Sequence, residues 1–326
     1  MSFYIYVTRK IPEAGLRLLQ EQFNVEVYGG KSPVPRKTLE EAVAGADGLV
    51  CLLSDVIDAP LLDKAARLKI VANYAVGYNN IDIEAARQRG VMVTYTPGVL
   101  TNATAELAFA LIITLTRRIR QADRFTRQGR FVGWDPLLFL GDELAEKTLG
   151  IIGMGRIGAD LAAKCRAFGM SVIYHNRGRV DEATEAALAA RWTALEELLS
   201  EADIISIHAP LNASTRHLLN AKSMEKIKPG AFLINTARGE IVEEAALVEA
   251  LQTGRLKGAG LDVYEKEPAV TPELMALDNV VLLPHIGSAT AETRDNMAVM
   301  VAENVIAALS NGIPENLVPE MIADKG

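Results

Sequence analysis

The segment TLGIIGMGRIG sets three glycines between a strand-like apolar run and a helical pattern. Gly153, Gly155 and Gly158 have the spacing G-x-G-x-x-G. The first glycine permits a tight turn, the second lets the backbone approach a pyrophosphate, and the third lets helix and strand pack closely. Phosphate charge would then face the amino terminus of the helix. The strand-and-helix context therefore predicts a dinucleotide-binding turn. The residues predicted to line the cofactor here are Gly153, Met154, Gly155, Arg156, Ile157 and Gly158.

Strand-like and helical patterns alternate along nearly the whole chain, which is typical of βαβ units and a mostly parallel sheet. The strand-like runs before residue 97 are FYIYVT, NVEVYG, GLVCLL, KIVANY and VMVTYT. Those after residue 147 are TLGIIG, MSVIYH, DIISIHAP, AFLINTA, GAGLDV and NVVLLPH. Most of the second set are continuous apolar runs, which suit parallel strands covered on both faces. We therefore predict an α/β fold with two Rossmann-like, doubly wound parallel sheets.

Two long helical patterns, residues 101–120 and 290–309, mark where the chain passes between the two series. A chain that leaves its first domain near residue 98 and returns near residue 288 accounts for both helices. We predict a dinucleotide-binding Rossmann domain over residues 99–287. It is inserted into a flavodoxin-like substrate domain made of residues 1–98 and 288–326.

Charge and cysteine content narrow the class of partner. The chain has 34 Lys and Arg against 41 Asp and Glu, a net charge of −7. This is the wrong sign for nonspecific attraction to nucleic acid or to an anionic membrane, so a small metabolite is expected. Cys51 and Cys165 lie in no CxxC or Cys/His cluster, so we expect no metal site and a reducing cytoplasm. The most apolar stretch, residues 103–115, is shorter than the roughly 20 residues that a membrane span needs.

The residues after the strand MSVIYH bear on the choice of cofactor. An NAD enzyme is expected to carry a carboxylate there for the ribose 2′-hydroxyl, and this chain has Asn176 and Arg177 instead. Arg177 matches a 2′-phosphate, with Gly178 leaving room and Arg179 as a second cation. The alternative is an ordinary exposed turn. We predict that NADP(H) is preferred and that NAD(H) is possible.

Three ionisable residues stand at predicted strand ends or loops of the second series: Arg238 in NTARGE, Glu267 in LDVYEKEP and His285 in LLPHIGS. Hydride transfer to a ketone needs an acid for the forming alkoxide, and histidine suits this near neutral pH. A guanidinium can bind the carboxylate of a 2-keto acid with two hydrogen bonds. Glu267 can orient the imidazole and favour its protonated form. These three residues are the predicted catalytic group.

The chain resembles the D-isomer-specific 2-hydroxyacid dehydrogenases, and within this family it looks most like the glyoxylate and hydroxypyruvate reductases. The resemblance runs over nearly the full length, and its motifs are jointly specific. In chain order they are VANYAVGYNNID, TNATAELAFALI, LGIIGMGRIG, HAPLNASTRHLLN, LINTARGEIVEEAAL, GAGLDVYEKEP and VVLLPHIGSAT. The resemblance implies NADP(H)-dependent reduction of a small 2-keto acid, glyoxylate or hydroxypyruvate, to glycolate or D-glycerate.

The resemblance also implies roles for single residues. Arg238 would bind the substrate carboxylate and keto oxygen, His285 would be the acid/base, and Glu267 would be its partner. Asp262 would contact the nicotinamide amide. The other implied cofactor contacts are Thr104, Pro210, Thr236, Ala237 and Gly287, beside Asn176, Arg177 and Gly178. The implied substrate contacts are Leu53, Ser54, Val76, Gly77, Arg238, His285 and Trp134.

Two questions about partners and function remain open at this stage. The apolar helix over residues 104–115 and the segment WDPLLFL predict a two-fold homodimer through the nucleotide domains. Trp134 is either a packed aromatic or part of a loop that reaches the active site of a partner subunit. Alternative functions on the same fold are a cofactor-sensing corepressor, which the negative charge disfavours, and phosphoglycerate dehydrogenase. Phosphite dehydrogenases look similar but carry lysine where this chain has Val76, which favours a keto acid.

Overall fold

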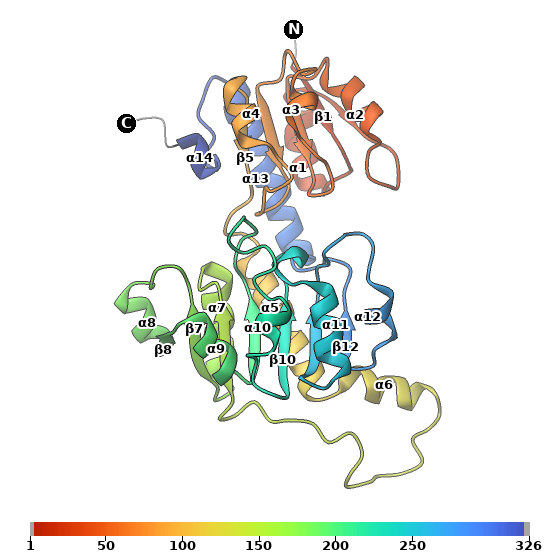
Figure 1. Ribbon diagram of the computed structural model, residues 1–326. Helices are drawn as coiled ribbons and strands as arrows, with labels where there is room; N and C mark the ends of the chain where they lie inside the picture. Colours follow the sequence, from red (N-terminus) through yellow and green to blue (C-terminus); the bar gives the residue numbers. More distant parts are fainter. Residues whose placement is uncertain (1–2, 323–326) are drawn as a thin grey trace. The chain divides into compact units, whose positions relative to one another are not determined.

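Two parallel sheets account for the fold, and each lies in its own unit of the chain. The computed structural model describes residues 3–322. Unit 1 runs to Leu100 and resumes at Ser288, and unit 2 is Thr101–Gly287 (Figure 1). The predicted class of two parallel-sheet α/β domains is confirmed. The roles assigned to the two units, with boundaries at residues 98 and 288, stay predictions.

Unit 1 contains a five-stranded sheet in the order β2-β1-β3-β4-β5, which is the flavodoxin-like order. Its strands are β1 (Tyr4–Val7), β2 (Asn24–Val27), β3 (Gly48–Cys51), β4 (Ile70–Asn73) and β5 (Met92–Thr94). The helices are α1 (Glu13–Gln20), α2 (Arg36–Val43), α3 (Ala59–Leu62), α4 (Ile83–Gln88), α13 (Ala291–Leu309) and α14 (Pro319–Ile322). Gly15 lets α1 and α13 approach closely, because a Cβ there would lie 2.2 Å from the carbonyl oxygen of Ala298. Thr290 begins α13 by accepting a hydrogen bond from the amide of Thr293.

Unit 2 contains a seven-stranded sheet in the order β12-β11-β10-β9-β6-β7-β8, a Rossmann order with one added strand. Its strands are β6 (Thr148–Ile152), β7 (Ser171–His175), β8 (Ala190–Trp192), β9 (Ile204–Ile207), β10 (Ala231–Asn235), β11 (Leu256–Leu261) and β12 (Val280–Leu282). The helices are α5 (Thr101–Thr116), α6 (Ile119–Arg127), α7 (Arg156–Ala167), α8 (Glu182–Leu188), α9 (Leu195–Glu201), α10 (Ala221–Met224), α11 (Glu244–Gln252) and α12 (Pro272–Ala276), with a 3₁₀ turn, η1 (Gly239–Ile241).

Two details of unit 2 differ from the sequence prediction. The helix expected over residues 101–120 ends at Thr116, because Arg118 adopts a left-handed backbone (φ +54°) and the chain restarts as α6. The Thr116 hydroxyl donates 2.9 Å to the carbonyl of Ile112, a local bond that competes with helix continuation. Strand β8 was not predicted, because three residues carry too little periodic pattern.

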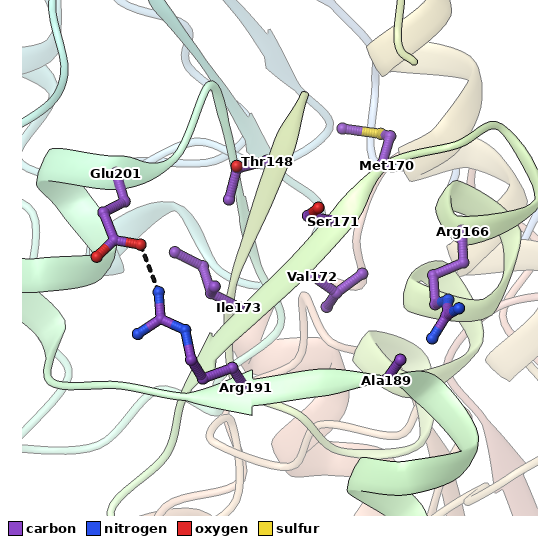
Figure 2. A pocket seen from close by; sticks show the side chains of 9 residues that line it. All are labelled: Thr148, Arg166, Met170, Ser171, Val172, Ile173, Ala189, Arg191 and Glu201. Atoms are coloured by element: carbon purple, nitrogen blue, oxygen red, sulfur yellow. Dashed lines mark hydrogen bonds and ion pairs between the residues drawn. The ribbon is translucent and has the colours of Figure 1, made fainter. Parts of the chain in front are cut away.

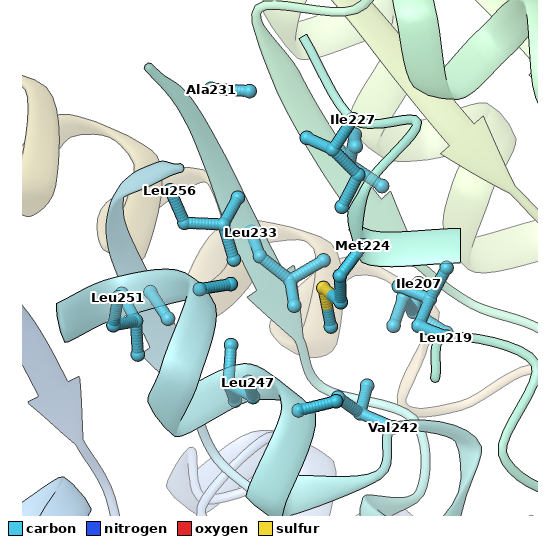
Figure 3. Close-up of a cluster of buried hydrophobic side chains, with 14 of the residues drawn as sticks. Ile207, Leu219, Met224, Ile227, Ala231, Leu233, Val242, Leu247, Leu251 and Leu256 are labelled. Atoms are coloured by element: carbon cyan, nitrogen blue, oxygen red, sulfur yellow. The ribbon is translucent and has the colours of Figure 1, made fainter. Parts of the chain in front are cut away.

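The core of unit 2 lies on both faces of its sheet, which explains the continuous apolar strands. On one face, side chains of α10, α11 and β10 interlock, among them Met224, Leu233 and Leu247 (Figure 3). On the other face α5 packs on the sheet, and its residues Leu111 and Ile112 are buried. One face of the apolar helix over residues 104–115 is therefore covered by its own unit, while Leu107, Phe109 and Ile113 on the rest of the helix are half-buried. Within residues 3–322, no helix has the length and apolar character that crossing a membrane requires.

Candidate active site

The glycine turn between β6 and α7 has the geometry that a phosphate-binding loop needs. Gly153 has φ +103°, and a Cβ there would lie 2.5 Å from the amide nitrogen of Ala209. A Cβ on Gly158 would lie 2.5 Å from the carbonyl oxygen of Gly153. By contrast, a Cβ on Gly155 would meet no atom within 4 Å, and no side chain caps α7 at this position. Gly153 and Gly158 therefore allow close packing of the backbone. Gly155 leaves open space at an uncapped helix amino terminus, and this space fits the pyrophosphate of a dinucleotide.

The loop after β7 supports that turn. The side-chain oxygen of Asn176 accepts a hydrogen bond of 2.7 Å from the amide of Met154, so Asn176 fixes the middle of the glycine turn. Arg177 and Gly178 are exposed, and Arg177 has no hydrogen-bond or ion-pair partner among the described residues. Arg179 was predicted to be available as a second cation; this role stays a prediction, and its side chain is already paired. It forms an ion pair of 2.6 Å with Glu185, which also accepts a hydrogen bond from a buried tyrosine.

Asp262 lies fully buried just after β11 and holds the segment that follows His285. Its two carboxylate oxygens accept hydrogen bonds of 2.7 Å from the amides of Ile286 and Gly287. Burial raises the pKa of Asp262, and these two amides oppose the shift. Thr104 completes the cluster, because its hydroxyl donates 3.1 Å to the carbonyl of Gly287. Three predicted cofactor residues thus share one contact network, although their contacts with a cofactor stay predicted.

His285 and Glu267 form the pair that the sequence predicted. Nδ1 of His285 lies 2.9 Å from Oε2 of Glu267, and Oε1 of Glu267 accepts a hydrogen bond of 3.1 Å from the amide of Tyr264. Burial would raise the pKa of Glu267, but the hydrogen bond and charge of His285, with the Tyr264 amide and Arg238, bring it below its ordinary value. Within residues 3–322, Nε2 of the imidazole has no hydrogen-bond partner.

Arg238 lies in the turn after β10, close enough to Glu267 for their charges to interact. Burial lowers the pKa of Arg238, and the carboxylates of Glu267 and Glu240 oppose the shift, so the guanidinium stays charged near neutral pH. Asn235 shapes the turn: its side chain donates 2.9 Å to the carbonyl of Arg238 and accepts 3.0 Å from the amide of Ala237. Gly239 is required next, because a Cβ would lie 1.9 Å from the backbone of Tyr264. The three predicted catalytic side chains are therefore brought together.

Two further predicted cofactor residues lie at strand ends of the same sheet. The hydroxyl of Thr236, just after β10, is buried and has no hydrogen-bond partner in the described part of the chain, so it can still bond a ligand. Pro210 lies exposed after β9, and its carbonyl accepts 2.7 Å from the hydroxyl of Thr215. His208, two residues earlier, lies 2.8 Å from the Ser206 hydroxyl. Burial lowers the pKa of His208 to about 4.

The predicted substrate contacts of unit 1 lie on the loops that follow β3 and β4. Leu53, Val76 and Gly77 are half-buried, and Ser54 is exposed. Sequence reasoning missed the residues that hold these loops. Asn73 donates a hydrogen bond of 2.8 Å to the carbonyl of Gly77. Asn80 donates hydrogen bonds of 3.1 Å to the carbonyls of Leu52 and Asp55. The carboxylate of Asp55 accepts a hydrogen bond of 2.8 Å from the amide of Leu52.

Trp134 lies in an irregular segment after α6 and contributes nothing to the packing of its own unit. Its side chain is 85% exposed, and Val132 is 97% exposed. The segment also exposes Phe131, Leu137 and Leu140. The reading of Trp134 as a packed aromatic is therefore wrong for this subunit. The contact of Trp134 with a substrate stays a prediction.

A separate pocket of about 360 Å³ lies at the amino ends of β6 and β7 (Figure 2). Its lining includes Arg166, Ser171 and Arg191, and no predicted site residue. Arg191 is already paired with Glu197 and Glu201. Open α/β sheets bind ligands at the carboxyl ends of their strands, so this pocket is not the candidate site.

Comparison with known proteins shows the family to which the chain is similar. The family model of the D-isomer specific 2-hydroxyacid dehydrogenase, NAD binding domain, matches residues 109–287. A glyoxylate reductase of Thermococcus litoralis is 50% identical over 318 residues, covering 96% of each chain.

Two solved structures are similar over the whole chain. An NADPH-dependent glyoxylate/hydroxypyruvate reductase of Sinorhizobium meliloti, in complex with NADP and malonate, has a TM-score of 0.87 at 36% identity and covers 98% of each chain. A D-lactate dehydrogenase of Aquifex aeolicus, complexed with NAD and lactic acid, has a TM-score of 0.85 at 30% identity, covering 97% of this chain and 98% of that one. The chain described here belongs to the D-isomer-specific 2-hydroxyacid dehydrogenases, enzymes that depend on a nicotinamide cofactor.

Proposed function

We propose that this enzyme reduces glyoxylate, hydroxypyruvate or both to the 2-hydroxy acid. The observation that carries the proposal is the pairing of His285 with Glu267 beside a charged, half-buried Arg238, at the carboxyl end of a dinucleotide-binding sheet. The high identity to a glyoxylate reductase over nearly the whole chain supports this choice of substrate class. A small keto acid needs one cation for its carboxylate and one proton donor for its carbonyl, and this cluster supplies both.

In the proposed reaction each of the three side chains has one task. The guanidinium of Arg238 binds the substrate carboxylate and polarises the keto oxygen. His285 donates the proton from Nε2 to the forming alkoxide, while Nδ1 stays bonded to Glu267. The Glu267 carboxylate orients the imidazole through its contact with Nδ1. The nicotinamide, when bound, supplies the hydride. In the reverse direction His285 accepts the alcohol proton.

We also propose that the cofactor is NADP(H), with NAD(H) used less well. No carboxylate stands at positions 176–178, directly after β7, to repel a 2′-phosphate, and Arg177 is exposed with no protein partner among the described residues. Gly178 beside it leaves room. Gly155, Thr236 and Asp262 are the proposed contacts for the pyrophosphate and the nicotinamide half. The NADP complex of the Sinorhizobium meliloti reductase supports the same choice.

Initial rates with a panel of 2-keto acids, each with NADPH and NADH, test substrate and cofactor together. We expect the highest kcat/KM with glyoxylate or hydroxypyruvate and NADPH. The highest value with a phosphorylated hydroxypyruvate would indicate phosphoglycerate dehydrogenase instead. Tight cofactor binding without turnover of any keto acid would indicate a cofactor-sensing protein.

We propose that the enzyme works as a homodimer and that the segment around Trp134 contacts the partner. A run of exposed apolar side chains over residues 131–140 supports this, since monomers rarely leave such a surface in water. Light scattering at micromolar concentration should give twice the chain mass of 35.2 kDa. A Trp134→Ala variant that stays dimeric and has an altered KM would indicate a direct substrate contact. A single-chain mass for the unmutated enzyme would contradict the dimer.

We propose the reducing cytoplasm as the location. Cys51 and Cys165 are both free and buried. Burial raises the pKa of Cys165 to about 12 and that of Cys51 well above its ordinary value, so neither is a reactive thiolate. Activity found in a secreted fraction would contradict this location.

A further inference from the structure

Two histidine–glutamate pairs arise from one short segment of the chain. Glu267 bonds His285, and Glu265, two residues earlier, lies 2.8 Å through Oε1 from Nε2 of His217. Both histidines have left-handed backbones, with φ +54° at His285 and +49° at His217. The first pair is the proposed acid/base pair. The second pair has no place in the reaction, so its purpose lies elsewhere.

Glu244, at the start of α11, connects this segment to the rest of unit 2. Its side chain is 8% exposed, and Oε1 accepts a hydrogen bond of 2.8 Å from the amide of Glu265. Oε2 accepts a short hydrogen bond from the hydroxyl of Thr271. In return, Oε2 of Glu265 accepts 3.2 Å from the amide of Glu244. The Glu244 carboxylate therefore binds both ends of the loop over residues 265–271, and Glu267 lies within this loop.

Burying a carboxylate is costly unless hydrogen bonds compensate it, so this arrangement calls for an explanation. The two oxygens of Glu244 accept from the Glu265 amide and the Thr271 hydroxyl, and an apolar residue in the same space would leave both donors without that acceptor. Burial would raise the pKa of Glu265, but the Glu244 amide and His217 bring it below its ordinary value. A set of directed bonds fixes the position of a backbone more narrowly than apolar contacts do.

We propose that Glu244 is a positioning residue for the acid/base pair, with Glu265 as its reciprocal partner. By holding the amide of Glu265 and the hydroxyl of Thr271, Glu244 sets the path of the loop and thereby the place of the Glu267 carboxylate against Nδ1 of His285. The proposal rests on the proposed function only in giving that pair a catalytic role. The geometric part stands on the contacts themselves.

Glu244→Ala removes the hydrogen bonds of this side chain to the Glu265 amide and the Thr271 hydroxyl. Glu244→Gln keeps two hydrogen bonds, because its amide oxygen can accept from Glu265 and its NH₂ can donate to the Thr271 hydroxyl. Misplacing a reacting group from outside the site can lower the rate by about a hundredfold. We expect Glu244→Ala to lower kcat by about tenfold to a hundredfold with little change in the Kd for NADPH. Glu244→Gln should restore most of the rate. Glu249→Ala, an exposed position on the same helix, is the matched control and should leave kcat unchanged.

Histidine-selective ¹⁵N NMR of the cofactor-free enzyme gives a readout that does not depend on turnover, since the chain has four histidines. In Glu244→Ala the Nδ1 signal of His285 should lose the displacement that a carboxylate partner gives, while His175 keeps its signal. Unchanged His285 signals together with unchanged kcat would overturn the proposal. If Glu244→Ala does not fold, Thr271→Val removes only the hydrogen bond between Thr271 and Glu244. The Nδ1 signal of His285 should then shift in the same direction by a smaller amount.

Failure of the proposed function would look different. An unmutated enzyme without keto-acid turnover, in which Glu244→Ala still displaces the His285 signal, would reject the reaction and keep the positioning role. An active enzyme in which Glu244→Ala behaves like Glu249→Ala would reject the positioning role and keep the reaction.

Discussion

Nδ1 of His285 lies 2.9 Å from Oε2 of Glu267, although eighteen positions separate the two residues in the chain. The other oxygen of Glu267 is bonded to the amide of Tyr264, so the carboxylate is fixed on both sides. His285 is held by its left-handed backbone and by the bonds of Asp262 to the next two amides. Glu267 and His285 are therefore each held in place by contacts of their own, in addition to the contact between them.

Removing either partner should lower turnover, and the two losses should differ in size. A positioned general acid contributes about 10²- to 10⁴-fold, so His285→Ala should lower kcat by that range. Glu267→Gln keeps a hydrogen bond but loses the charge, worth about 1.5 to 3 kcal/mol or roughly tenfold to a hundredfold. Steady-state kinetics measures both, and fluorescence titration should show NADPH binding unchanged. Near-normal turnover in His285→Ala would rule out its role as the acid.

Replacement of Arg238 should affect substrate affinity as well as rate. Arg238→Lys keeps the charge but loses the planar pair of donors, so KM for the keto acid should rise by about tenfold to a hundredfold. Arg238→Ala should raise KM further and also lower kcat, because the keto oxygen is no longer polarised. KM values from initial rates check this. A variant with altered NADPH affinity and normal KM would place Arg238 on the cofactor instead.

Gly153 and Gly155 should respond in opposite ways to alanine. Gly153→Ala forces a side chain into φ +103° and against the backbone at Ala209, so unfolding free energy should fall by about 2 kcal/mol or more. Gly155→Ala meets no protein atom and has an extended backbone (φ −91°, ψ −162°), so stability should be unchanged or slightly higher. Its methyl group would stand where the cofactor backbone approaches, and NADPH affinity should fall about tenfold or more. Denaturant unfolding and cofactor titration separate the two effects, and normal NADPH binding by Gly155→Ala would contradict the site.

The sequence predicts the glycine turn well, because strand, glycines and helix are contiguous and their spacing alone encodes the geometry. It also predicts that Arg238, Glu267 and His285 stand at strand ends. It does not predict what holds them. Asn235 and Glu244 form hydrogen bonds with backbone groups. Because every residue type offers the same backbone carbonyl and nearly every type the same amide, the partner cannot be recognised from its side chain in the sequence. A polar residue at the very end of a buried strand, as Asn235 is, was the available signal.

The same limit applies to charge pairing around the cofactor loop. Arg177 and Arg179 are equivalent in the sequence, and only the fold brings Glu185 to Arg179. The break of the long helix at Arg118 could not be predicted from the sequence either. Its cause is a backbone conformation, and the polar residues around it are equally common on exposed helix faces.

His208 should make folding stability depend on pH. Its folded pKa is about 4, against 6.5 ordinarily, so between these values the unfolded chain binds a proton that the folded chain does not. Stability from this group is thus complete above pH 6.5 and declines as the pH falls to about 4, by about 3 kcal/mol in total. Denaturant unfolding at pH 7 and 4.5 should show a smaller acid loss in His208→Gln than in the unmutated enzyme. Equal losses would mean that His208 titrates normally.

The choice of cofactor should reside in the two residues after β7. A charge-assisted contact of Arg177 with the 2′-phosphate, worth about 1.5 to 3 kcal/mol, predicts at least about a tenfold preference for NADPH in kcat/KM. Asn176→Asp keeps an oxygen for the amide of Met154, so the glycine turn survives while a repelling charge is added. Combined with Arg177→Ala, it should erase or invert the preference.

Arg179→Ala is the matched control for that experiment. Arg179 is already paired with Glu185, so its removal should change the ratio of the two kcat/KM values by less than about threefold. Equal efficiency of NADPH and NADH in the unmutated enzyme would mean that Arg177 stays in solvent when the cofactor binds. A ratio that depends on Arg179 instead would mean that its ion pair with Glu185 opens when the cofactor binds.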